Sequence, residues 1–265
     1  MDEPAPLHDF VTADAETASA VSDSGPAKSD PAVAGCVQAV VNSAVLWLDP
    51  SGAVYWPDQR ALIVADLHLE KGSAFASRGR FLPPYDTAHT LDRLTHVIRR
   101  FDPTRVICLG DSFHDPAAGG RIAPADLAQL AALMGERDWI WVSGNHDPAQ
   151  IHPILGASVG EWRAGPLVLR HEAEPDGISD LSGHFHPTAL VATRARRVRR
   201  RCFVHDESRL ILPAFGAYTG GLNILTPAVR RLLERGFKTW LIGDRRLYAV
   251  PRKRLLADNS RATDR

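Results

Sequence analysis

Short apolar runs alternate with amphipathic stretches through the middle of the chain. The apolar runs occupy residues 61–65, 106–109 and 139–142. Between them, apolar residues recur at steps of three or four: Leu91, Leu94, Ile98 and Phe101 before Asp102-Pro103, and Leu127, Leu130, Leu133 and Met134 before Gly135. This spacing predicts two helices that end at those positions. Short apolar strands joined by amphipathic helices are typical of βαβ units around a parallel sheet.

Strand patterns dominate on both sides of this region. Residues 44–48 and 53–56 flank the turn sequence Asp49-Pro50-Ser51-Gly52 and predict a hairpin. Later strands are expected at residues 166–170, 178–182, 202–205, 210–212, 239–242 and 247–250, and residues 228–235 predict a helix. We therefore expect a single domain with two packed sheets over residues 36–256. Residues 1–35, rich in Ala, Ser, Asp, Thr and Pro, predict a disordered acidic tail, and residues 257–265 a flexible C-terminus.

Composition agrees with a globular protein and shows an uneven distribution of charge. The 265 residues are 45% hydrophobic and 23% charged, which excludes a disordered, collagen-like or repeat-dominated chain. The net charge is zero, but residues 1–30 carry −6, residues 31–193 carry −6 and residues 194–265 carry +12. Of the 31 basic residues 27 are Arg. This bias is compatible with a phosphate-bearing partner, and equally with genome composition.

Cysteine usage and the lack of a long apolar run predict the compartment. Cys36, Cys108 and Cys202 are widely spaced and form no C-x-x-C pair, which favours a reducing environment. The N-terminal residues do not resemble a signal peptide, and no run reaches the roughly 18 apolar residues of a membrane span. We therefore expect a cytoplasmic protein without membrane contact.

Polar clusters follow the three apolar runs. These clusters are Asp66-Leu67-His68, then Gly110-Asp111-Ser112-Phe113-His114, then Gly144-Asn145-His146-Asp147. Further on, His171 follows a predicted strand, and His184 and His186 form an H-x-H pair whose imidazoles point the same way in extended chain. Because the carboxyl ends of parallel strands lie on one edge of a sheet, we expect the clusters to converge there.

The combination of these residues indicates a site for two metal ions. Taken alone, a D-x-H triplet is a weak signal, a strand-end Asp is usually a helix cap, and a lone His171 is usually structural. Together they are too many polar groups for a core that leaves them unpaired. Without thiolates a structural zinc site is not expected, whereas carboxylate, imidazole and amide oxygen suit Mn²⁺, Fe²⁺ or Zn²⁺. Seven ligands fit two ions that share one bridging carboxylate.

In this order, the motifs between residues 61 and 187 resemble those of the calcineurin-like metallophosphoesterase superfamily. The resemblance implies an α/β fold, a four-layer sandwich of two mixed β-sheets flanked by helices. It implies two divalent ions and the following ligands: Asp66, His68 and His186 on one ion, Asn145, His171 and His184 on the other, and Asp111 as the bridge. It also implies that His146 lies outside the set of metal ligands and faces the substrate phosphate.

A narrower resemblance covers residues 66–72, 82–87, 110–115 and 212–221. These segments are similar to those of the bacterial ligase-associated DNA damage response endonuclease (PdeM) family. The resemblance implies an Mn²⁺-dependent phosphodiesterase that is associated with a DNA ligase, an exonuclease and a helicase. The acidic tail has no counterpart in that family.

The histidines beside the ligands suggest how the reaction proceeds. His114, three residues after Asp111, resembles the Mre11-type nuclease branch, although it is also compatible with a simple turn cap. We expect a DNA endonuclease that works by metal-activated hydroxide, with His146 and His114 helping the leaving oxygen to depart. The alternatives are a small-molecule phosphatase, a cyclic-nucleotide phosphodiesterase, and a non-catalytic scaffold. DNA is the expected partner, and a homodimer is compatible with the sequence.

Residues 193–201 contain six arginines, at positions 194, 196, 197, 199, 200 and 201. One hypothesis is that some of them neutralise DNA phosphates beside the site. The other is that the run is a solvated, disordered loop.

Overall fold

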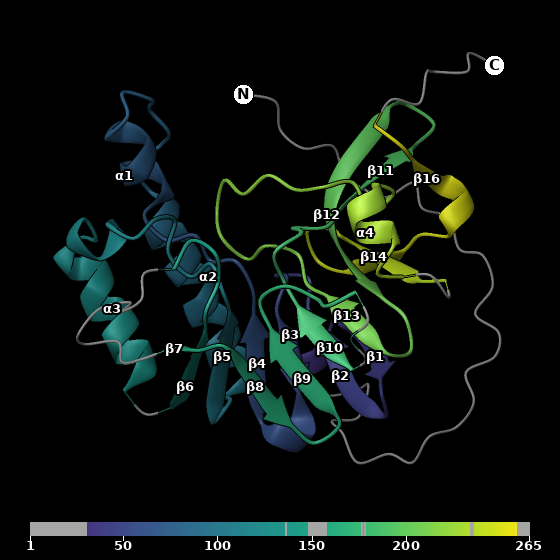
Figure 1. The fold of residues 1–265 in the computed structure, drawn as a ribbon, viewed down its shortest axis with the longest axis horizontal. Helices are drawn as coiled ribbons and strands as arrows, with labels where there is room; N and C mark the ends of the chain where they lie inside the picture. The colour runs from purple at the N-terminus through teal and green to yellow at the C-terminus, as the bar shows by residue number, and fades with distance from the viewer. Residues whose placement is uncertain are drawn as a thin grey trace.

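Two mixed β-sheets pack face to face, with helices on their outer faces (Figure 1). The structure is a computed structural model that describes residues 31–135, 137–147, 158–175, 177, 179–233 and 236–258. No helix in these residues is both long enough and apolar enough to cross a membrane. The α/β sandwich predicted from the sequence is confirmed.

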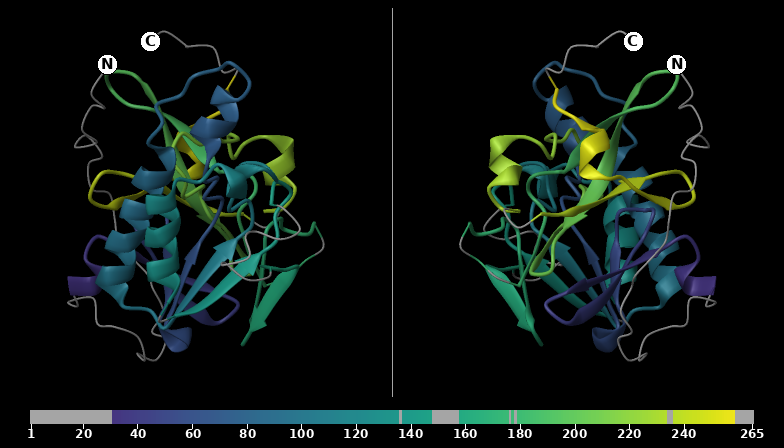
Figure 2. Two further views of the ribbon diagram at one scale, coloured as in Figure 1. Left: turned by 90° about the vertical axis from the view of Figure 1, so that its left-hand side faces the viewer. Right: turned by 90° about the vertical axis from the view of Figure 1, so that its right-hand side faces the viewer.

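The first sheet contains the predicted βαβ units. Its strands lie in the order β1 (Val37–Val41), β2 (Ala44–Leu48), β3 (Val54–Trp56), β4 (Ala61–Val64), β5 (Arg105–Leu109), β6 (Asp138–Val142) and β7 (Ser158–Val159). Neighbours from β1 to β4 pair antiparallel, and those from β4 to β7 pair parallel. The helices of this half are α1 (Lys71–Ala76), α2 (Asp86–Phe101) and α3 (Pro124–Met134). Figure 2 shows α2 and α3 side by side on the outer face of this sheet.

The second sheet follows in the chain and runs in the order β15-β14-β12-β13-β10-β9-β8, with β11 beside β12 and β16 beside β11. Its strands are β8 (Glu161–Ala164), β9 (Leu167–Arg170), β10 (Asp180–Ser182), β11 (Thr188–Ala192), β12 (Arg197–His205), β13 (Arg209–Ile211), β14 (Lys238–Ile242), β15 (Leu247–Ala249) and β16 (Leu255–Leu256). The helix predicted at residues 228–235 is the short α4 (Pro227–Arg230). Residues 234 and 235 lie outside the described residues.

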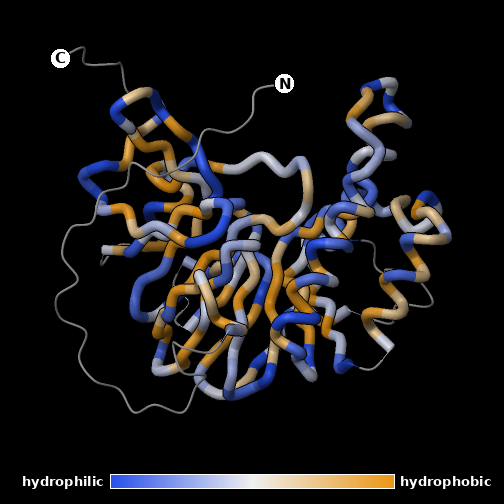
Figure 3. Tube along the Cα trace, turned by 180° about the vertical axis from the view of Figure 1, so that it is seen from behind, coloured by the Kyte–Doolittle hydropathy of each residue, from blue (hydrophilic) through white to orange (hydrophobic). Residues whose placement is uncertain are grey.

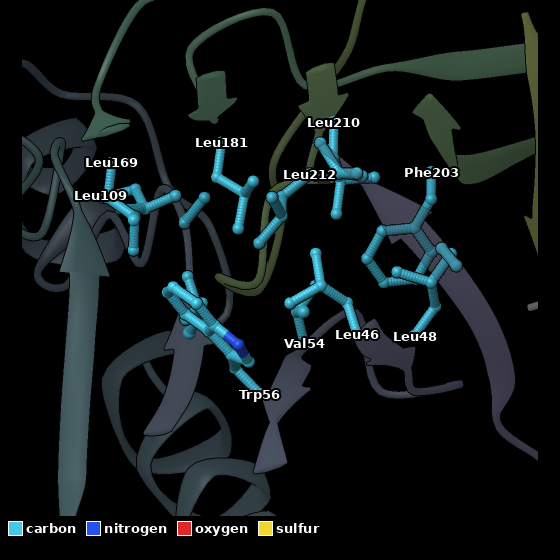
Figure 4. Packing of buried hydrophobic residues seen from close by; sticks show 14 of the residues in the cluster. Leu46, Leu48, Val54, Trp56, Leu109, Leu169, Leu181, Phe203, Leu210 and Leu212 are labelled. Carbon is cyan, nitrogen blue, oxygen red and sulfur yellow. The ribbon is translucent and has the colours of Figure 1, made fainter. Parts of the chain in front are cut away.

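Three apolar clusters separate the four layers. The first lies between α2, α3 and the first sheet and includes Leu94, Leu130 and Cys108. The second fills the space between the two sheets, where strand side chains from both sides point toward one another (Figure 4). The third packs residues around α4 against the outer face of the second sheet. Hydrophobic segments recur along both the strands and the helices, between hydrophilic turns (Figure 3). Each fully buried leucine contributes about 1.5–3 kcal/mol relative to an exposed one, so these clusters hold the layers together.

The structure corrects two expectations about chain order. The interpretation of the arginine run as a disordered loop is wrong for residues 197–201, which belong to β12 (Arg197–His205) and pair with β11. Residues 31–35 of the predicted tail are also ordered: the short 3-10 turn Pro31–Val33 buries Val33, and Arg100 donates to the carbonyl oxygens of Ala32 and Ala34. Residues 1–30 and 259–265 lie outside the described residues.

Candidate metal centre

The predicted polar clusters converge at the carboxyl ends of the strands. Hydrogen bonds between loops hold them there: the His68 amide donates to the Asp111 carbonyl at 2.9 Å, and the His146 amide donates to Asp111 Oδ1 at 2.9 Å. The two sheets are joined at the same place, because the His184 amide donates to both carboxylate oxygens of Asp66 at 3.1 and 3.0 Å. The site is therefore built from both sheets.

One group of potential ligands consists of Asp66, His68 and His186. Their ligand atoms all lie within 4.8 Å of one another. The Nε2 atoms of His68 and His186 are 3.2 Å apart, and His186 Nε2 is 3.5 Å from Asp66 Oδ1. These are the three residues that the family resemblance places on one ion.

A second group lies beside the first. His171 Nε2 is 3.5 Å from Asp111 Oδ2 and 3.1 Å from His184 Nδ1. Asn145 lines a pocket together with His171 and Glu172. Asp111 Oδ2 is also 3.9 Å from His68 Nε2, so this carboxylate lies between the two groups. That position is the one that a bridging ligand requires.

Backbone carbonyls orient two of the imidazoles. His171 Nδ1 is 3.1 Å from the Leu109 carbonyl oxygen, and His186 Nδ1 is 3.2 Å from that of Gly220. Because a carbonyl only accepts hydrogen bonds, each Nδ1 carries a proton, which leaves Nε2 as the nitrogen that can ligate a metal when the ring is neutral. Such hydrogen bonds are the usual support of metal-binding histidines.

Left-handed backbone is concentrated at the same residues. Asp66, His68, Asp111, His184 and His186 have φ values between 44° and 66°. For a residue with a side chain this conformation costs about 1–2 kcal/mol. Gly110 has φ of 71°, and a Cβ atom there would lie 2.3 Å from His171 Nδ1, so only glycine fits. The strained backbone of these loops therefore directs the side chains of the candidate ligands into the site.

The electrostatics of the site fit bound cations. Asp66 and Asp111 are 0% and 3% exposed, and within the described residues neither forms an ion pair with Lys or Arg. Ring nitrogens of neighbouring imidazoles lie little more than 3 Å apart, an arrangement that a shared cation would stabilise. Burial, together with the nearby His186 and Lys71, lowers the pKa of His68 to about 2, so this imidazole is neutral and able to ligate. Burial also lowers the pKa of His186, but the hydrogen bond and charge of Asp66 outweigh it and raise that pKa.

His114 and His146 lie at the edge of the two ligand groups. Each ring centroid is 5.6 Å from that of His68. The side chain of His146 is 53% exposed, and its Nε2 lies 4.0 Å from Asp111 Oδ2. Burial and the charge of Lys71 lower the pKa of His114. Both histidines therefore border the potential metal ligands, as the sequence led us to expect.

Three further residues support the site and were assigned no role from the sequence. Asp147 accepts hydrogen bonds from the amides of Phe113 and Gly144 at 3.0 and 2.9 Å and so ties the β5 and β6 loops together. Glu172 lies 3.6 Å from His184 Nε2. Lys71 begins α1 and influences His68 and His114. Asp147 stands in the Gly144–Asp147 motif, and Lys71 lies in the segment 66–72 that carries the narrower resemblance; Glu172 carries no sequence signal.

Comparisons with known proteins found a matching family and similar solved structures. Residues 59–211 match the model of the calcineurin-like phosphoesterase family. The fold is similar to that of Pseudomonas putida nuclease MPE, with 32% sequence identity and a TM-score of 0.62 over 81% of this chain and 100% of that chain. The phosphoesterase Yfce from E. coli overlaps at 13% identity and a TM-score of 0.35, over 72% of this chain and 97% of that chain. No match was found among curated proteins.

Proposed function

The chain belongs to the calcineurin-like phosphoesterase family, and on this premise we propose that it is a dinuclear-metal phosphodiesterase that acts as a DNA endonuclease. Metal-dependent phosphoester hydrolysis follows from the family. The narrower choice of a nuclease is supported by the likeness to nuclease MPE over the full length of that protein.

One structural observation carries the proposal: a buried carboxylate, Asp111, lies between two groups of ligand atoms. We assign Asp66, His68 and His186 to one ion and Asn145, His171 and His184 to the other. Two divalent ions held there would lower the pKa of a water molecule and stabilise negative charge on the phosphoryl oxygens. The imidazole-rich set favours Mn²⁺ over Mg²⁺, with Fe²⁺ and Zn²⁺ as alternatives.

The residues beside the ligands perform the proton transfers in this proposal. His146 is 53% exposed and lies beside Asp111, and in this proposal it donates a proton to the leaving 3′ or 5′ oxygen. His114 stacks against it and holds its ring in place. An alkoxide leaving group of DNA needs this proton, because its conjugate acid is weak.

The biological setting extends the proposal. By resemblance we place the protein in bacterial DNA damage repair, in the cytoplasm, together with a DNA ligase, an exonuclease and a helicase. The three cysteines form no disulfide in the structure, which suits a reducing compartment. A homodimer is compatible with this setting.

A panel of substrates tests the function. The purified protein with Mn²⁺ is expected to cleave plasmid DNA and a bis-aryl phosphodiester, and to act poorly on an aryl phosphomonoester. A preference for the monoester, with intact plasmid, would replace the endonuclease by a small-molecule phosphatase. A preference for a cyclic nucleotide would identify a cyclic-nucleotide phosphodiesterase. The absence of turnover with every ester would favour a non-catalytic scaffold.

A further inference from the structure

Arg93 on helix α2 and Arg201 on strand β12 contact adjacent residues of one loop, Phe215 and Ala214. The guanidinium carbon of Arg93 lies 4.4 Å from the centre of the Phe215 ring. Arg201 Nη1 donates to the Ala214 carbonyl oxygen at 2.6 Å. Both contacts are made with the loop of residues 212–226, which joins β13 to α4 and extends toward α2 (Figure 1). We call these two residues the arginine pair.

The arginine pair lacks acidic partners in the part of the chain that the structure describes. Nε and Nη2 of Arg93 are buried and make no hydrogen bond there, and neither arginine forms an ion pair with an acid there. Burial lowers the pKa of Arg93 to about 10, and the neighbouring charge of Arg201 contributes to the shift. Both guanidinium groups are therefore charged at neutral pH, and the fold holds two like charges together with donors unused.

Several other partly or fully buried arginines have acidic partners. Arg209 contacts Asp180, and Arg100, two turns beyond Arg93 on α2, forms an ion pair with Asp49 at 2.8 Å. Asp49 is the acid of the turn that carries Gly52, where an added Cβ would lie 3.9 Å from Arg201 Nη1. This acid is already engaged by Arg100, so it does not neutralise the arginine pair.

We infer that the arginine pair binds a phosphate group. A guanidinium fork donates two parallel hydrogen bonds to phosphate oxygens, and a phosphate would supply both the acceptors and the negative charge that are missing. Both residues are partly exposed, so rotation of the side chains would bring the unused donors to solvent and to the anion. The phosphate comes either from the DNA backbone or from free inorganic phosphate. If the phosphate belongs to DNA, the inference rests on the proposed function and adds to it a residue contact with the substrate. If the phosphate is inorganic, the inference is independent of that function.

The same loop connects the arginine pair to the metal centre. The amides of Phe215 and Gly216 donate to the carbonyl oxygens of Ala65 and Asp66 at 2.8 and 3.0 Å. Gly220 of this loop accepts the hydrogen bond that orients His186. A phosphate on the arginine pair therefore fixes the loop that supports two metal ligands, and a DNA backbone held there is anchored beside the reacting phosphate.

Thermal unfolding of the full chain after treatment with a chelator tests for the phosphate site by a measurement that does not depend on enzymatic activity. Chelation removes phosphate binding by metals. At matched ionic strength, saturating inorganic phosphate is expected to raise the unfolding temperature by about 5 °C or more relative to chloride. Arg93→Met and Arg201→Met should abolish the increase, whereas Arg99→Met, an exposed control on α2, should retain it. In chloride, Arg93→Met should be at least as stable as the unchanged chain, because it removes an unpaired buried charge.

DNA binding in the presence of chelator separates the two sources. If the phosphate belongs to DNA, Arg93→Met reduces the slope of log affinity against log salt by about 0.9, and Arg99→Met leaves it unchanged. If phosphate stabilises the unchanged chain but Arg93→Met leaves the salt slope of DNA binding unchanged, the site binds free inorganic phosphate instead. Arg93→Lys, which keeps the charge without the fork, should show a partial effect on both measurements.

The inference is overturned if phosphate does not raise the unfolding temperature of the unchanged chain and Arg93→Met does not change the salt slope of DNA binding. It is also overturned if phosphate stabilises Arg93→Met and Arg201→Met as much as it stabilises the unchanged chain. If both methionine variants fail to fold, the response of the unchanged chain and of Arg93→Lys decides. Cleavage of plasmid DNA by the unchanged chain with Mn²⁺ tests the proposed function separately, so the two failures are distinguishable.

Discussion

The rings of His114 and His146 lie almost parallel, with 6° between their planes and 5.9 Å between their centroids. They come from loops after neighbouring parallel strands, β5 and β6, and both stand edge-on to His68. The stack places one exposed imidazole against a more buried one at the edge of the candidate metal centre. A donor of protons to a leaving group is expected at this edge.

His146→Ala is expected to reduce DNA cleavage by about 10²–10⁴-fold and to reduce cleavage of an activated aryl diester far less. The aryl leaving group departs without a proton, whereas the sugar alkoxide does not. His114→Ala should give a smaller loss in the same direction. Metal analysis is expected to show two ions per chain in both variants, because neither residue is an assigned ligand. Equal losses on both substrates would indicate that these histidines position the phosphate and do not donate protons.

Asp111→Ala is expected to lower metal content below two ions per chain and to abolish turnover, since its carboxylate lies between both ligand groups. Asp111→Asn keeps an acceptor for the His146 amide but loses the charge, so it should fold better and remain inactive. Asp115→Ala, four residues further on, is the matched control and should keep both ions. Normal activity and metal content in Asp111→Ala would refute the two-metal assignment.

Removing the metals is expected to destabilise the fold as well as to stop catalysis. Asp66 and Asp111 are buried close together, and bound cations compensate their charges. With ions about 100-fold above their dissociation constant, each site adds about 2.7 kcal/mol. Calorimetry should therefore show a lower unfolding temperature in chelator, and Mn²⁺ should restore both the temperature and the turnover better than Mg²⁺. Unchanged stability and activity in chelator would exclude a metal centre.

His205, remote from the candidate centre in sequence, should make stability depend on pH. Burial lowers its pKa below 6.5. Its Nε2 accepts from Trp240 Nε1 at 3.0 Å, while Nδ1 lies 3.3 Å from the Asp206 carbonyl oxygen, so the folded state holds the neutral ring. The unfolded chain binds the proton more tightly. The stabilisation is therefore complete above about pH 6.5 and is lost as the pH falls below it, by up to about 1.4 kcal/mol per pH unit.

Urea unfolding of the His205→Gln variant beside the unchanged chain isolates this contribution. Gln retains an acceptor for Trp240 and does not titrate, so the variant should lose less stability between about pH 7 and about pH 5. Identical pH profiles for the two chains would show that His205 is not responsible.

The exposed part of the arginine run is expected to contact DNA. Arg194, Arg196 and Arg197 lie at the β11–β12 turn and are exposed, whereas Arg199 pairs with Asp258. Changing the three exposed arginines to Ser should lower the slope of log affinity against log salt by about 0.9 for each DNA phosphate that these side chains neutralise. Hydrolysis of a small diester should be unaffected, and Arg99→Ser is the control. A slope equal to that of the control would assign the turn no role in binding.

Much of the first half of the fold was predictable because its central strands are buried on both faces. Strands β4, β5 and β6 therefore read as apolar runs, and the polar residues that follow them stand out. Their parallel arrangement places those residues on one edge, which is why the candidate site was visible in the sequence before any geometry was known.

The second half was less predictable because its strands have mixed surroundings. Strand β8 has only partly buried or exposed residues, and the first residues of β12 are arginines that pair with a neighbouring strand. The orientation of His171 and His186 depends on carbonyl groups 62 and 34 residues away, which carry no residue-specific signal. Arg93 likewise looks like any polar residue on a helix surface, and only its packing on Phe215 reveals it.

The hydrogen bonds from His184 to Asp66 span 118 residues, and this separation affects when the centre is formed. Contacts so distant in sequence close late, after the local helices and hairpins have folded. On the ribosome, a chain that has reached only the end of β6 carries Asp66 and Asp111 but not His171, His184 or His186. The nascent first sheet is therefore an incomplete enzyme. Hydrolytic competence is acquired only when the second sheet docks onto it, so the protein cannot hydrolyse a phosphoester before the strands of the second sheet have been synthesised.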